Sequence, residues 1–160
     1  MFKVGIIGPE ASGKTTLARY LAKRYQGELV EEYARYYVEQ KGSRDLSYEE
    51  VCTIARHQIE ELRTLARQSN TTEKVLFFDT ELIVTKVWLE EVFDACPEWL
   101  KQALREYPMD VYLLTYPDLP WTQDGARYNG SAEQRTRLFE RYEQEIQALD
   151  IPYYIIKHIS

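Results

Sequence analysis

The fold of this chain is decided by Gly8-Pro9-Glu10-Ala11-Ser12-Gly13-Lys14-Thr15. The stretch matches the pattern GxxxxGK[ST], in which glycines let backbone N–H groups converge on a phosphate. The apolar run Phe2–Ile7 before it predicts a buried strand, and a helical pattern begins at Lys14. We therefore expect a strand, a phosphate-binding loop and a helix whose N-terminus attracts negative charge.

The loop pattern assigns chemical roles to its positions. The Lys14 ammonium is expected to reach the β- and γ-phosphates of ATP, and the Thr15 hydroxyl to bind Mg²⁺. The predicted ATP-binding residues are Gly8, Glu10, Ala11, Ser12, Gly13, Lys14, Thr15 and Thr16.

A second apolar run, Val75–Asp79, predicts a strand that ends in a carboxylate. Beside the first strand, Asp79 would face the phosphate-binding loop and hold Mg²⁺ directly or through water. Alternatively, Asp79 or Thr80 caps the helix that follows, because Asp and Thr are common at that position. We predict Thr15 and Asp79 as metal ligands, and Lys14 and Asp79 as catalytic residues.

Strands and helices are expected to alternate along the chain. Ser47 and Ser131 each begin a pattern typical of a capping box before a long helix. Such alternation favours a parallel sheet with helices on both faces. We predict an α/β, P-loop NTPase fold with five parallel strands, a single domain over residues 1–160 and a lid loop at about 117–135. The expected strands are 2–7, 28–31, 74–79, 110–116 and 153–157, and the expected helices are 14–27, 33–39, 48–68, 80–93, 97–105 and 132–149.

Composition argues against several classes of protein. The net charge is −6, with 12 basic and 12 acidic side chains in residues 1–80, and 8 basic and 14 acidic in residues 81–160. Binding to nucleic acid or to an anionic membrane requires a basic patch, so neither partner is expected. Cys52 and Cys96 have neither disulfide-framework nor zinc spacing, and no apolar run is long enough for a transmembrane helix. We expect a cytoplasmic protein that acts on small molecules. The sequence leaves the oligomeric state open.

Missing motifs narrow the choice among phosphate-loop proteins. A GTPase needs [NT]KxD to read the base, and the nearest string, Thr85-Lys86-Val87-Trp88, lacks the Asp. A complete AAA-type motor needs a further helical lid domain, for which 160 residues are expected to leave no room. A small kinase remains, with an acceptor-side base and an arginine-bearing lid.

Several blocks beyond the phosphate-binding loop form a set that is more specific than the loop alone. They are Glu32-Tyr33-Ala34-Arg35-Tyr36-Tyr37, Phe78-Asp79-Thr80-Glu81, Pro117-Asp118-Leu119-Pro120-Trp121 and Asp124-Gly125-Ala126-Arg127. Together with Gly8–Ala18, they resemble the ribosylnicotinamide kinase domain of the NadR family. The blocks follow the order of that family and span residues 2 to about 141.

The resemblance implies transfer of a phosphoryl group from ATP–Mg²⁺ to the 5′-hydroxyl of nicotinamide riboside, giving nicotinamide mononucleotide in NAD salvage. Two alternatives stay open. One is a kinase of another nucleoside-like acceptor. The other is a regulatory ATP-binding module, because the 160 residues are expected to hold neither the family's DNA-binding segment, nor its adenylyltransferase domain, nor the last helix of its kinase domain.

Acceptor-side residues are expected after the second strand. Glu32 would orient the acceptor hydroxyl and accept its proton as transfer proceeds. Glu31 could take this place instead, or Glu32 could simply pair with Arg35 three positions on. We predict that Glu32, Tyr33 and Arg35 bind the substrate, although for Tyr33 a place in the core is the favoured interpretation.

The lid is expected to supply the remaining residues. Arg127 lies between glycines and would stabilise the transferring phosphoryl group when the lid closes. Arg135 and Arg137 point about 200° apart on a helix, so only one can face the nucleotide, and we predict Arg135 as catalytic. Trp121 could stack on the nicotinamide ring or pin the lid closed, and Asp124 could bond ribose hydroxyls or offset the ring's charge.

Overall fold

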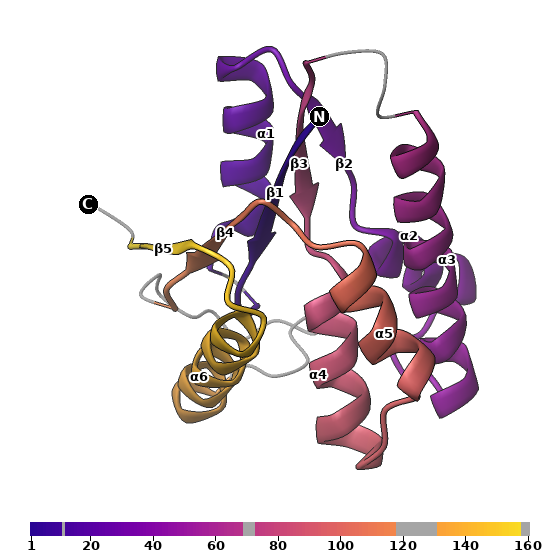
Figure 1. The fold of residues 1–160 in the computed structure, drawn as a ribbon. Coiled ribbons are helices and arrows are strands. Elements are labelled where there is room, and N and C mark those ends of the chain that lie inside the picture. Colours follow the sequence, from indigo (N-terminus) through magenta and orange to yellow (C-terminus); the bar gives the residue numbers. More distant parts are fainter. Residues whose placement is uncertain (11, 69–72, 118–130, 158–160) are drawn as a thin grey trace.

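The apolar run before the phosphate-binding loop forms the central strand of a five-stranded parallel sheet, as predicted. The computed structural model describes residues 1–10, 12–68, 73–117 and 131–157. The strand order is β2-β3-β1-β4-β5 (Figure 1). The strands are β1 (Phe2–Ile7), β2 (Glu28–Val30), β3 (Val75–Asp79), β4 (Val111–Thr115) and β5 (Tyr153–Ile156). Because β1 pairs with both β3 and β4, the phosphate-binding loop lies between the ends of those two strands.

Six helices connect the strands within the described residues. They are α1 (Lys14–Arg24), α2 (Tyr33–Lys41), α3 (Tyr48–Arg67), α4 (Leu82–Phe93), α5 (Glu98–Glu106) and α6 (Ala132–Ala148). Ser47 forms the predicted capping box with Glu50 at the start of α3. At the start of α6, the Ser131 side chain accepts a hydrogen bond from the Gln134 N–H.

The start of α4 differs from the prediction. Neither Asp79 nor Thr80 caps this helix: the N-cap is Glu81, whose Oε1 accepts from the Ile83 N–H at 2.9 Å. Thr80 has a left-handed backbone conformation with φ 69°, which turns the chain before the helix begins at Leu82. The carboxylate of Asp79 is therefore left for the phosphate-binding loop.

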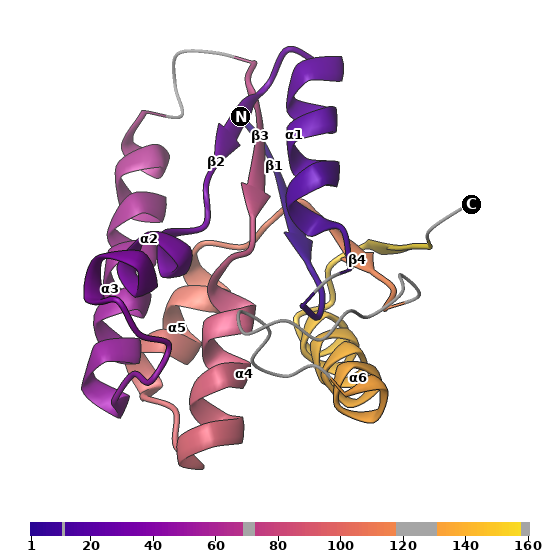
Figure 2. The same ribbon diagram turned by 180° about the vertical axis from the view of Figure 1, so that it is seen from behind.

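The inner strands β1, β3 and β4 are covered on both faces, which explains why they are continuous apolar runs. On one face Val4, Ile6 and Phe77 pack with Ala18 and Ala22 of α1. Helices α3 to α6 cover the other face over Ile7, Leu76, Phe78, Tyr112 and Leu114 (Figures 1 and 2). None of the helices in the described part of the chain is both long and apolar enough to cross a membrane.

Candidate active site

The phosphate-binding loop is tethered to the neighbouring strand β4. The Ser12 hydroxyl is 2.5 Å from Thr115 Oγ1, and a Cβ added to Gly8 would lie 1.9 Å from the same oxygen. Gly13 has φ 87°, a conformation that glycine adopts without steric cost. Lys14 Nζ donates to the Gly8 carbonyl oxygen at 3.0 Å, so its ammonium lies against the loop that would hold the phosphates.

Thr15 and Asp79 are brought together by the pairing of β1 with β3. Thr15 Oγ1 donates to Asp79 Oδ2 at 2.8 Å. Asp79 is buried, and its Oδ1 has no hydrogen-bond partner among the described residues. Because buried carboxylate oxygens normally have partners, this orphaned oxygen beside a hydroxyl fits a site for a hard cation such as Mg²⁺.

Glu32 lies at the start of α2, where it caps the helix without a side-chain cap hydrogen bond. Its Oε2 is 3.4 Å from Arg35 Nη2, and Arg35 in turn donates to Thr15 Oγ1 at 3.2 Å. Burial raises the pKa of Glu32, and the nearby Lys14 ammonium partly counteracts this. Glu31 is exposed, whereas Glu32 is half-buried and pairs with Arg35.

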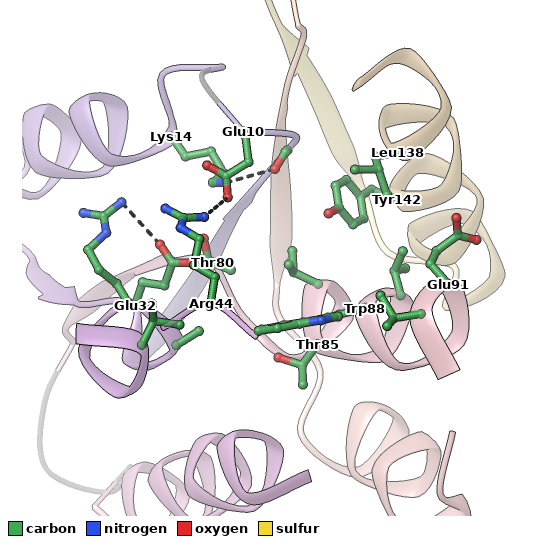
Figure 3. Close-up of a pocket in the computed structure, with 17 residues that line it drawn as sticks. Glu10, Lys14, Glu32, Arg44, Thr80, Thr85, Trp88, Glu91, Leu138 and Tyr142 are labelled. Atoms are coloured by element: carbon green, nitrogen blue, oxygen red, sulfur yellow. Dashed lines mark hydrogen bonds and ion pairs between the residues drawn. The ribbon is translucent and has the colours of Figure 1, made fainter. Parts of the chain in front are cut away.

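A pocket of about 180 Å³ opens between the phosphate-binding loop, α2, α4 and α6. Figure 3 shows Lys14 and Glu32 on one side, Leu138 and Tyr142 on the other, and Trp88 between them. The predicted residues that line this pocket are Gly8, Glu10, Lys14, Glu32 and Arg35. The pocket therefore joins a cation and a carboxylate on the phosphate side to an aromatic wall.

The lining residues that the sequence did not assign to the site include Arg44, Thr80, Trp88 and Tyr142. Arg44 Nη1 is 3.9 Å from Glu10 Oε1 across the pocket (Figure 3). From the sequence, Trp88 suggested only packing of a helix face. A signal was nevertheless present, because Val84, Trp88 and Glu91 follow the strand end at a spacing that shares one helix face.

Tyr33 and Thr16 do not line this pocket. The Tyr33 ring stacks on His57 of α3 with ring centroids 3.5 Å apart. It borders a neighbouring hollow that also includes Glu32, Arg35 and Asp79. Thr16 is exposed on α1. The substrate-binding role predicted for Tyr33 stays a prediction, and the same is true of the nucleotide contact predicted for Thr16.

The first turns of α6 separate the two candidate arginines as their spacing predicted. Arg135 is buried, whereas Arg137 is exposed and its Nη1 is 2.6 Å from Glu91 Oε1. Arg141 binds Glu90 and Glu91 at 2.9 and 2.6 Å, which joins α6 to α4. Four predicted residues, Ala11, Trp121, Asp124 and Arg127, lie outside the described residues.

The fold and the site define a P-loop protein, with a phosphate-binding loop, a hydrogen-bonded Thr15–Asp79 pair beside it, and an adjoining pocket. The chain belongs to the family described as AAA domain, whose sequence model matches residues 3–160.

A curated relative links the chain to NAD metabolism. The trifunctional NAD biosynthesis/regulator protein NadR of Escherichia coli (strain K12) is 30% identical over 135 residues. The alignment covers 82% of this chain and 32% of the relative, so the chain spans about a third of that protein's length. This likeness agrees with the predicted resemblance to the NadR family.

Solved structures show the same fold. NadR protein in complex with NR has a TM-score of 0.75 at 23% identity, covering 96% of this chain and 44% of that one. NadR protein in complex with NAD and AMP-PNP has a TM-score of 0.76 at 24% identity, covering 98% and 44%. Thymidylate kinase from Ehrlichia chaffeensis has a TM-score of 0.70 at 15% identity, covering 99% and 88%.

Proposed function

We propose that this protein is a small-molecule kinase that transfers the γ-phosphoryl group of ATP to the 5′-hydroxyl of nicotinamide riboside. The observation that carries the proposal is the placement of Glu32 beside Lys14 in the pocket that adjoins the phosphate-binding loop. A carboxylate in that position can serve an acceptor hydroxyl, whereas binding of a nucleotide alone does not require one.

The reaction follows from the roles of these residues. Lys14 and the loop N–H groups bind the β- and γ-phosphates, and Glu32 orients the acceptor hydroxyl and takes its proton. A bond forms between the acceptor oxygen and the γ-phosphorus, and the bond from that phosphorus to the bridging oxygen of ADP breaks. Held by Thr15 and Asp79, Mg²⁺ would offset the negative charge of the phosphates.

Two observations support nicotinamide riboside as the acceptor. The relatives include an NAD biosynthesis protein and a NadR structure in complex with NR. The pocket also offers Trp88 for a flat ring and the carboxylates of Glu10 and Glu32 for a cationic one. Trp121 and Asp124 keep their proposed roles in acceptor binding. Arg127 keeps its proposed role in stabilising the transferring phosphoryl group, and Arg135 keeps its proposed catalytic role at the nucleotide. We propose a cytoplasmic location and no nucleic-acid or membrane partner.

The test is incubation of the protein with ATP–Mg²⁺ and a panel of nucleosides that includes nicotinamide riboside. We expect nicotinamide mononucleotide as the product, and loss of activity in a folded Lys14→Ala variant. Turnover of another nucleoside, but not of nicotinamide riboside, would reject the acceptor. Binding of ATP without turnover of any acceptor would instead favour a regulatory ATP-binding module.

A further inference from the structure

Thr80 has an unusual backbone for its residue type. It follows Asp79 at the end of β3, and its N–H donates to the Ile6 carbonyl oxygen at 2.9 Å. Its φ of 69° lies in the left-handed region, which a β-branched residue such as threonine rarely occupies. Glycine would adopt the same conformation at a smaller steric cost. Strained residues of this kind cluster at functional sites, so the side chain at this position calls for a functional reason.

The Thr80 hydroxyl is also unusual. Thr80 is only 6% exposed, and its Oγ1 is buried with no hydrogen-bond partner among the residues that the structure describes. Buried hydroxyl groups nearly always have a partner, because the loss of hydration is costly without one. This hydroxyl therefore lacks, among the described residues, the partner that a buried hydroxyl normally has.

The position of Thr80 indicates whether its hydroxyl serves the acceptor or the metal ion. Thr80 lines the same pocket as Lys14, Glu32 and Trp88 (Figure 3), whereas the proposed metal ligands Thr15 and Asp79 do not line it. The Thr15 and Asp79 side chains are instead bonded to each other. Thr80 thus lies on the acceptor side of the site, next in sequence to the proposed metal ligand Asp79.

We propose that Thr80 is a further catalytic residue, whose hydroxyl hydrogen-bonds an oxygen of the acceptor nucleoside beside Glu32. This assignment rests on the proposed kinase function. The bond would hold the acceptor in the pocket while Glu32 serves the hydroxyl that receives the phosphoryl group. The strained backbone fixes the Thr80 side chain at this place before the acceptor arrives.

Thr80→Val separates this role from a structural one. Valine keeps the branched shape and removes only the hydroxyl, so the ligand-free variant should melt at the same temperature as the parent or higher. Its kcat/KM for the acceptor should fall about 5- to 10-fold, as loss of one hydrogen bond predicts, with KM for ATP unchanged. Thr80→Ser should restore most of the lost kcat/KM, because it supplies the hydroxyl again.

Thr85→Val is the matched control for stability. Thr85 is also buried at the pocket, but its Oγ1 already donates to Gln58 Oε1 at 2.7 Å. Removal of this hydroxyl leaves the Gln58 oxygen without its partner, so Thr85→Val should lower the melting temperature. The two threonine-to-valine changes are thus expected to affect the ligand-free protein in different ways.

Three outcomes would overturn the role of Thr80 while the parent is an active kinase. They are an unchanged kcat/KM for the acceptor in Thr80→Val, a lower melting temperature of that variant, and a changed Mg²⁺ requirement with normal acceptor kinetics. Failure of the proposed function has a different signature, because the parent itself would then phosphorylate no nucleoside of the panel. In that case the assignment of Thr80 is overturned as well.

Discussion

Glu32→Gln tests the central chemical claim with a change of almost no volume. The amide keeps the size of the side chain and can still accept a hydrogen bond, but it is a far weaker base than the carboxylate. Loss of a positioned general base lowers rates by about 10²- to 10⁴-fold. We expect kcat for acceptor phosphorylation to fall within that range, with little change in the dissociation constant of ATP.

The same substitution should have only a small effect on folding. Glu32 pairs with an Arg35 side chain that is 52% exposed, and such solvated pairs contribute about 0–1 kcal/mol. Burial raises the pKa of Glu32, so the folded protein also tolerates the neutral amide well. For a chain of this size, about 1 kcal/mol corresponds to about 2–4 °C in melting temperature. A larger loss would mean that reduced folding, rather than chemistry, lowers the activity.

The assay is a steady-state measurement of product formation with ATP–Mg²⁺ and nicotinamide riboside. Glu31→Gln is the matched control, because it makes the same carboxylate-to-amide change at the adjacent, exposed residue. The control should keep the activity of the parent. The reasoning is refuted if Glu32→Gln loses less than about 10-fold in kcat, or if Glu31→Gln shows the larger loss.

Three further substitutions test the electrostatics and packing of the site. Arg35→Ala should move the acidic limb of the kcat/KM profile to higher pH, because the Arg35 charge lowers the pKa of Glu32. Glu81→Gln should flatten the dependence of stability on pH. Burial raises the pKa of Glu81 to about 7, so the folded protein binds this proton more tightly than the unfolded chain, and the parent loses stability as pH rises from about 4.5 to about 7. Gly8→Ala should lower the free energy of unfolding by about 1–3 kcal/mol and weaken ATP binding, because the new Cβ would lie 1.9 Å from Thr115 Oγ1.

Each of these substitutions has a direct measurement. Initial rates from about pH 5 to pH 9 locate the acidic limb of the kcat/KM profile for Arg35→Ala. An acidic limb at the same pH as in the parent, or at a lower pH, contradicts the pairing with Glu32. Urea unfolding at about pH 5 and pH 8 tests Glu81→Gln, which should exceed the parent in stability only at the higher pH. Thermal unfolding and nucleotide titration test Gly8→Ala, for which parent-like values of both would contradict the packing argument.

The predictable part of this protein is local in sequence. The pattern of the phosphate-binding loop lies within eight consecutive residues. The strand before the loop and the strand that ends at Asp79 are predominantly apolar runs. The Ser47 capping box was predictable for the same reason, because its partners are three residues apart. The cap of α4 was not, because the left-handed turn at Thr80 moves that role on to Glu81.

The sequence by itself therefore determined the fold class, and it predicted the phosphate-binding residues and the carboxylates that could serve the chemistry. Only the tertiary structure decided which of them meet. It placed half-buried Glu32 in the same pocket as Lys14 and left Glu31 exposed, and it brought Trp88 of α4 and Tyr142 of α6 to that pocket. The physical reason is that this pocket joins segments far apart in the chain, whose approach is set by helix packing on the sheet rather than by any local pattern.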